Sequence, residues 1–144
     1  MEEASFRIRL AEGFLNEARQ DHGLSRWRSC VDNGQLAVEN AAKSVLALLG
    51  PVGRTHQPAP LIREALAEGA FDDEHREAVA LIVEYAELLG PDIHTRSDYG
   101  DEASGLTPWE LFGDADAGQA LTWAEHAVSL AIGIVVPVTT TGSQ

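Results

Sequence analysis

The charged pair most suggestive of chemistry in this 144-residue sequence is Glu39 and Lys43, one helical turn apart. Glutamate followed four residues later by lysine is the favourable orientation for an ion pair on a helix. Lys43 is the single lysine of the chain and stands beside the small residues Ala41 and Ala42. Two interpretations are open. The pair either lines a groove in which Lys43 meets a phosphate as a point charge, or it fixes helix packing or a dimer interface.

A second group of chemically capable residues falls in residues 90–106, which we expect to be an irregular segment. Arg96 could clamp a phosphate there, with His94 nearby, and Tyr99 could stack on a base. In the alternative interpretation, Asp98 caps a turn and Tyr99 covers the end of the core. Both interpretations stay open from the sequence.

His56 lies in the loop 50–58, which is rich in glycine and proline. Together with Arg54 it could contact an anion, or it could be a hydrogen-bonded loop histidine. The loop lacks the glycine, lysine and serine or threonine spacing of a P-loop.

The sequence offers little for metal or nucleophilic chemistry, so we expect no metal site, no cofactor and no catalytic residue. Its nearest match to a di-iron motif is Asp72-x-x-His75, which lacks the paired Glu-x-x-His motifs that such bundles use. Cys30 is predicted to be a small core residue. Core or interface positions are predicted for Trp27, Trp109 and Trp123.

The hydrophobic pattern predicts helices throughout, because apolar residues recur every three to four positions. Gly23 is placed to end the first helix, and Ser25 to cap the second. Gly50-Pro51 is expected to end the second helix and Pro137 the last. Four long amphipathic helices imply an all-α fold, an antiparallel up-and-down four-helix bundle with short extra helices in the connections. The predicted long helices are 2–22, 26–49, 73–89 and 114–136; the short helix is 59–68, and a capping box with proline at N1 starts a single turn at 107–110.

One domain is predicted over residues 1–138, followed by a disordered tail at 139–144. Small residues in the middle of the second helix, Gly34 among them, should let neighbouring helices approach closely. The buried face of the first helix is predicted to carry Phe6, Leu10 and Phe14, flanked by Ile8 and Leu15.

The composition is strongly acidic, with 23 aspartates and glutamates, 10 lysines and arginines and a formal net charge of −13. Such a surface repels phosphate backbones, so binding to nucleic acid is not expected. The acidity is explained either by adaptation to high salt, as in a halophile, or by a GC-rich genome. We expect a cytoplasmic protein without a membrane segment, because the sequence shows no signal peptide and its longest apolar run, 130–138, is half a membrane span.

The second helix resembles the signature of the HEPN domain family (higher eukaryotes and prokaryotes nucleotide-binding). That signature has a glutamine, a small residue, a glutamate and, four residues later, a lysine before an apolar run. This sequence reads QLAVENAAKSVL over residues 35–46. His56 matches a histidine that the family commonly has before its short helix, and residues 94–99 are similar to the family's Arg-Tyr-Pro-Asp region.

The resemblance implies a homodimeric helical bundle with a nucleotide site in a groove between helices. It also implies a protein partner of the minimal nucleotidyltransferase type, encoded next door in a toxin–antitoxin-like pair. One branch of the family consists of ribonucleases marked by an arginine, four to six residues and a histidine. No arginine of this sequence is followed by a histidine at that spacing, so ribonuclease activity is not carried over.

We therefore expect a nucleotide-binding or accessory module without catalytic activity of its own. Its ligand would be held by Glu39, Lys43, His56, Arg96 and Tyr99, with Lys43 and Arg96 converging on one cationic pocket. The alternatives are a structural dimer that docks another protein without a ligand, and a ribonuclease with an atypical site.

Overall fold

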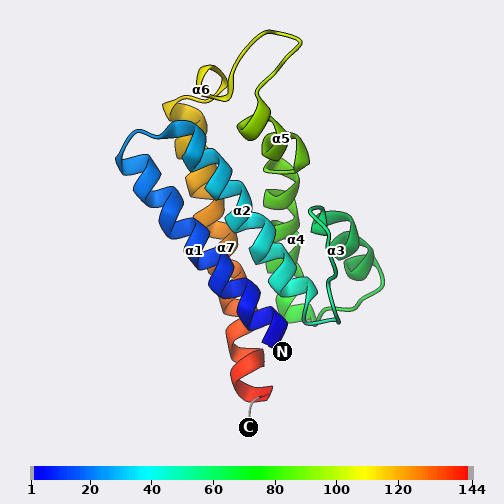
Figure 1. Cartoon of the computed structure of the whole chain (residues 1–144). Helices are drawn as coiled ribbons and strands as arrows, with labels where there is room; N and C mark the ends of the chain where they lie inside the picture. The colour runs from blue at the N-terminus through cyan, green and yellow to red at the C-terminus, as the bar shows by residue number, and fades with distance from the viewer. Residues whose placement is uncertain (1, 143–144) are drawn as a thin grey trace.

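The computed structural model describes residues 2–142, and over that range the chain is a helical bundle, as predicted. Three long helices, α1, α2 and α7, run side by side, and α3, α4 and α5 lie along the other side of α2 (Figure 1). The helices are α1 Glu2–Gly23, α2 Trp27–Leu46, α3 Pro58–Ala67, α4 Asp73–Leu88, α5 Pro91–Tyr99, α6 Pro108–Leu111 and α7 Asp114–Gly142.

The turn between α1 and α2 differs from the predicted one. Ser25 was expected to cap α2, but it adopts a left-handed conformation with φ 58°, and the residue preceding the helix is Arg26. The Arg26 amide donates to the carbonyl of Asp21 across the turn at 2.8 Å. The tight reversal therefore places the cap one residue later than the sequence pattern suggested.

The buried face of α1 was predicted wrongly. Phe6 is 48% exposed, while Ile8 and Leu15, expected only to flank the core, are buried. The core face instead follows small residues, Ala4, Ala11 and Ala18. Alanines let α1 lie close to α2, so the close approach of the two backbones, rather than the size of the side chains, determines which face of α1 is buried.

Helix α2 is the centre of the fold and is buried almost all round between Gly34 and Val45. A Cβ added to Gly34 would lie 3.4 Å from the carbonyl oxygen of Ala120 on α7. The predicted close approach of neighbouring helices is confirmed at this point. Because α2 has no wide solvent-facing stripe, its polar residues are forced into the interior.

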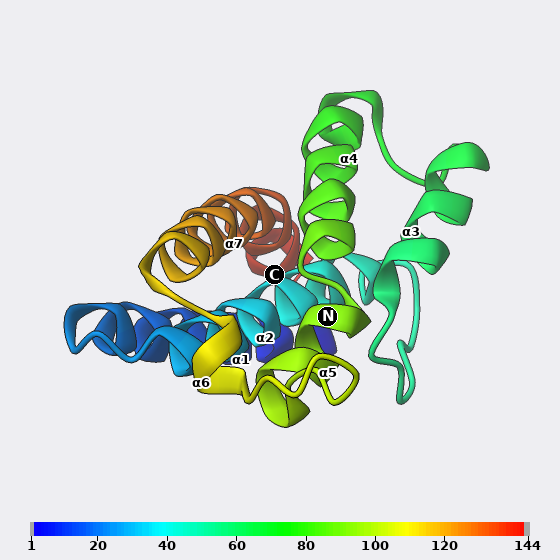
Figure 2. The same ribbon diagram turned by 90° about the horizontal axis from the view of Figure 1, so that it is seen from above.

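Helix α4 crosses the direction of α1 and α2 when the molecule is seen from above, with α3 on its outer side (Figure 2). Its buried residues are Val79, Ile82, Val83 and Ala86, whereas Leu81 on the same helix is 37% exposed. Residues of α2, α3 and α4 line a pocket at this crossing.

The segment expected to be irregular contains the helix α5. Pro91 occupies its first turn, where a missing N–H costs nothing. Gly100 follows its end with φ 77°, in a conformation that favours glycine. The capping box at Thr107 and Glu110 was predicted correctly, with the Thr107 amide donating to the Glu110 carboxylate at 3.2 Å.

Helix α7 does not end at Pro137 but continues to Gly142. A proline removes one backbone hydrogen bond without necessarily ending a helix. Here the Thr139 hydroxyl has two carbonyls as alternative acceptors for its hydrogen, those of Val135 and Val136, at 3.0 and 3.1 Å. The rest of the expected disordered tail, residues 143–144, lies outside the described residues.

The stretch Asp114–Thr139 of α7 is long and apolar enough to cross a membrane by length and composition, with a mean hydropathy of 1.5. It packs against α1, α2 and α4. Mostly buried core helices of soluble proteins pass the same test, and 33% of the window in α7 is buried in the described chain.

Candidate functional site

The predicted Glu39–Lys43 pair is confirmed, and it is buried. The Lys43 Nζ and Glu39 Oε2 atoms are 3.0 Å apart, with both side chains about 5% exposed. The Gln35 amide also donates to Glu39 Oε1, at 3.2 Å. Burial of two opposite charges is tolerated because each neutralises the other and the Gln35 amide gives the carboxylate a further hydrogen bond.

His56 approaches the same carboxylate from the loop before α3. Its Nδ1 atom lies 3.3 Å from Glu39 Oε2, so the interpretation of His56 as a hydrogen-bonded loop residue is confirmed. Its imidazole is 74% exposed and stacks on the ring of His94, with centroids 5.9 Å apart and planes 13° apart. The two histidines join the Glu39 region to α5.

A pocket of about 370 Å³ opens beside Glu39, where α4 crosses α2. That size is within the range of small-molecule sites. Its walls are mainly apolar, and its polar groups come from α2, α3, α4 and the loop before α3. The lining residues are Gln35, Glu39, His56, Gln57, Pro58, Ala59, Pro60, Arg63, Ala86, Glu87, Leu89, Gly90 and Pro91.

The Gln35 side chain, which lines this pocket, is only 2% exposed. Its Oε1 atom is buried and has no hydrogen-bond partner within residues 2–142. An unpartnered buried acceptor is costly, on the order of 1–3 kcal/mol. A ligand with an N–H group that reached this atom from the pocket would remove that cost.

The cation of this pocket is Arg63 on α3, which forms an ion pair with Glu87 on α4. Both side chains are about half exposed, at 53% and 47%. An exposed ion pair of this kind holds its partners weakly. Arg63 is thus free to exchange Glu87 for an incoming anion.

The cationic pocket shared by Lys43 and Arg96 is not what the structure shows. Neither residue lines the pocket beside Glu39. Lys43 is engaged by Glu39, and Arg96 pairs with Asp92 at 3.8 Å on α5. Tyr99 is 75% exposed and does not cover the core. The structure brings together Glu39, Lys43 and His56 and leaves the other two predicted residues apart.

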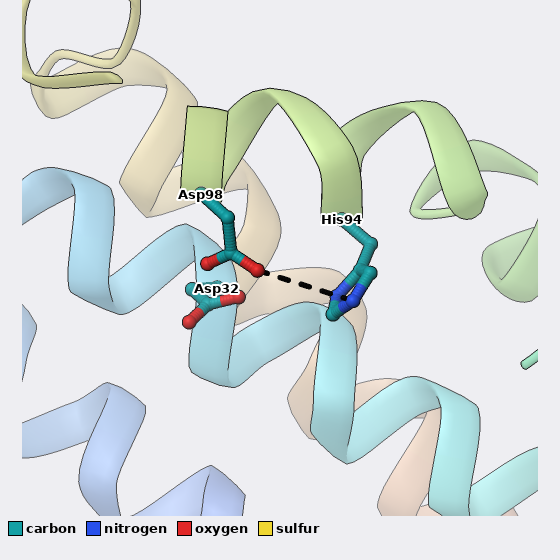
Figure 3. Close-up of side chains that lie close together, drawn as sticks. All are labelled: Asp32, His94 and Asp98. Atoms are coloured by element: carbon teal, nitrogen blue, oxygen red, sulfur yellow. Dashed lines mark ion pairs between the residues drawn. The ribbon is translucent and has the colours of Figure 1, made fainter. Parts of the chain in front are cut away.

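A second cluster of titratable groups lies where α5 packs on α2. Figure 3 shows Asp98 and His94 projecting from α5 towards Asp32 on α2. One ligand-type atom from each of these residues lies within 4.8 Å of the others. Burial raises the pKa of Asp32, and the Asp98 charge raises it further, while the Ser97 hydroxyl bond opposes the shift.

This cluster was not predicted from the sequence. Its signal was His94-x-x-x-Asp98, which places two ligand-type side chains on one helical face. This spacing was not interpreted as a helical face because residues 90–106 were expected to be irregular. The predicted role of Asp98 as a turn cap is replaced by an ion pair with Arg28, at 3.5 Å.

Another concavity, of about 380 Å³, surrounds the start of α2 and α6. Arg28 lies over the ring of Trp109 there, 5.7 Å from its centroid. Trp109 is 74% exposed in the described chain, so the predicted core position is wrong for this residue and the interface position stays a prediction. Cys30, by contrast, is buried as predicted.

Fold and site together define a small all-helical module with a pocket beside a buried ion pair. The HEPN domain family model matches residues 4–134, so this chain belongs to the HEPN domain family. It is also similar to a solved structure, the crystal structure of TT1696 from Thermus thermophilus. The TM-score is 0.65 at 18% sequence identity, covering 91% of this chain and 97% of that chain. At this identity the likeness concerns the fold alone. The comparison with curated proteins found no match.

Proposed function

We propose that this HEPN module binds a nucleotide in the pocket beside Glu39 and acts as an accessory to a catalytic partner. The observation that carries the proposal is the buried Oε1 atom of Gln35, which has no hydrogen-bond partner within residues 2–142 and belongs to a residue that lines a mainly apolar pocket. Sites for small ligands typically combine apolar walls with a few such polar groups.

The nucleobase of the bound nucleotide would face Gln35 and Glu39. A carboxylate has about four acceptor positions, and the Glu39 carboxylate meets three groups, those of Gln35, Lys43 and His56. One position of Glu39 and the Oε1 atom of Gln35 are left to accept N–H groups. Guanine presents a ring N–H and an amino group on one edge, and adenine an amino group, whereas uracil presents a single ring N–H. The order of affinity is therefore expected to be GTP, then ATP, then UTP.

The phosphates would lie at the mouth of the pocket, against Arg63. The guanidinium group matches phosphate oxygens in a bidentate geometry, and the exposed Arg63–Glu87 pair is easily exchanged. Lys43 then acts as a positioning residue for Glu39. Arg96 and Tyr99 have no place in this site.

Calorimetry with GTP, ATP, UTP and guanosine tests the proposal, in low and in high salt. Gln35→Leu is expected to weaken GTP and guanosine alike by about tenfold, since one hydrogen bond to a buried acceptor is lost. Arg63→Gln is expected to weaken GTP but not guanosine. Arg76→Gln is the matched control, because Arg76 is similarly exposed on α4 and pairs with Asp73.

No binding heat at millimolar nucleotide, in either salt condition, contradicts the nucleotide proposal. Equal losses in Arg63→Gln and Arg76→Gln contradict the placement of the phosphates. Circular dichroism of each variant confirms that the helices are retained.

The proposed partners are a second copy of this chain and a minimal nucleotidyltransferase that performs the phosphoryl chemistry. Leu130 and Ile132 of α7 are only partly buried in the single chain and Val136 is 43% exposed, so α7 has apolar surface that a second copy could cover. Sedimentation analysis tests the dimer, and co-purification with the neighbouring gene product tests the partner. A monomeric protein that recovers no nucleotidyltransferase contradicts this part of the proposal.

A further inference from the structure

The contact between α2 and α5 holds a cluster of side chains that the proposed nucleotide site does not use. Asp32 comes from α2, and His94 and Asp98 come from successive turns of α5 (Figure 3). The His94 Nε2 and Asp98 Oδ2 atoms are 3.9 Å apart. One ligand-type atom from each of the three residues lies within 4.8 Å of the other two.

We propose that Asp32, His94 and Asp98 form a binding site for a divalent transition-metal ion of the Zn²⁺ class. One imidazole nitrogen and two carboxylate oxygens are a donor set that such ions accept, with further positions filled by water. Protein ligands lie at about 2.0–2.2 Å from Zn²⁺, so the three atoms must close by roughly 1 Å. Rotation of side chains that are partly exposed is sufficient for that movement.

Neighbouring groups already orient the carboxylate of Asp32. The Ser97 hydroxyl donates to Asp32 Oδ1 at 3.1 Å, and this leaves Oδ2 available. Ser97 itself is fully buried. A fixed hydroxyl behind a carboxylate is the kind of supporting contact that metal ligands have in proteins.

The imidazole of His94 is not committed to a structural hydrogen bond. Its Nδ1 atom is buried and lacks a partner in the part of the chain that the structure describes. The contact of Nε2 with Asp98 is long, at 3.9 Å. Within residues 2–142, coordination of a metal ion by this ring would therefore break no hydrogen bond shorter than the 3.9 Å contact with Asp98.

Arg28 explains how the two carboxylates are tolerated without an ion. Its guanidinium lies 3.5 Å from Asp98 Oδ1 and donates to the Ser97 carbonyl at 2.9 Å. The fold therefore does not depend on the metal, and Arg28 competes moderately with it. Mg²⁺ and Ca²⁺ prefer more oxygen ligands than this cluster supplies and no imidazole, so the site should favour Zn²⁺ over both.

Calorimetry of the full chain after EDTA treatment and dialysis tests the site, with ZnCl₂, MgCl₂ and CaCl₂ as separate titrants. We expect one equivalent of Zn²⁺ to bind. His94→Asn and Asp98→Asn should each weaken binding by at least about tenfold, because each removes one ligand. The visible spectrum of bound Co²⁺ provides a second readout that is independent of heat.

The chain offers matched controls for both substitutions. Asp92→Asn removes the same charge from the same helix, at a residue paired with Arg96, and His75→Asn removes a histidine from α4. Both controls should bind Zn²⁺ within about twofold of the parent chain. The proposal is overturned if folded protein binds no stoichiometric Zn²⁺ at 100 µM, if the controls lose as much as the cluster variants, or if Mg²⁺ binds more tightly than Zn²⁺.

Discussion

Replacing Lys43 by methionine should be among the most destabilising single changes in this protein. Lys43 and Glu39 are buried together, with Nζ and Oε2 3.0 Å apart. Without the ammonium, the Glu39 carboxylate keeps only the Gln35 amide and the exposed His56 ring. Leaving a buried charge uncompensated costs about 3–5 kcal/mol. Glu39→Gln in the same chain removes that charge, so the double variant should recover much of the loss.

Urea denaturation followed by circular dichroism at pH 7 measures the effect. Arg76→Met is the matched control, because it breaks an exposed pair with Asp73 at 3.7 Å and should cost less than about 1 kcal/mol. In a domain of this size, the Lys43→Met loss corresponds to a melting temperature lower by on the order of 10 °C. The reasoning is refuted if Lys43→Met costs no more than Arg76→Met, or if the double variant is less stable than Lys43→Met alone.

Three further predictions concern stability. Gly100→Ala should lower the free energy of unfolding by about 1–3 kcal/mol, because φ is 77° and a Cβ would collide with the Leu106 carbonyl oxygen. Gly13→Ala is the control: a Cβ there has open space on α1, so it should not destabilise the protein in the same urea assay. Equal losses in the two variants would refute the backbone argument. Burial raises the pKa of the Cys30 thiol from 9.0 to about 11, so between these values the unfolded chain releases a proton that the folded chain retains. Stability should therefore fall as pH rises through this window, by up to about 1.4 kcal/mol per pH unit, and a Cys30→Ala variant with the same pH slope would show that the thiol is not responsible. If the charge of −13 reflects adaptation to high salt, the melting temperature should climb steeply from dilute buffer to molar KCl, and a flat response would favour genome composition.

The sequence predicted the helices well because their signals are local. The apolar spacing of α2 and the capping box at Thr107 depend on residues within a turn or two of each other. The errors arose where tertiary packing determines which side chains are buried or where a helix ends. Phe6 is exposed and Ile8 buried, because alanines bring α1 close to α2, and α7 runs through Pro137 with support from the Thr139 hydroxyl.

The candidate site was predictable only in part, for a related reason. Glu39 and Lys43 share one helical face, so their contact follows from sequence spacing alone. Arg63 and the Asp32–His94 contact depend on how α3 and α5 pack, which no local pattern encodes. The Gln35 Oε1 atom, which is buried and has no hydrogen-bond partner among the described residues, likewise could not be predicted without the packing of other helices around α2.

A crystal structure of the protein soaked with GTP tests the central claim most directly, namely that a nucleotide binds beside the buried Glu39–Lys43 pair. We predict density for the base against Gln35 and Glu39 and for a phosphate against Arg63 in place of Glu87. An empty pocket at Glu39, with the nucleotide bound instead between Arg28 and Trp109, would contradict the account.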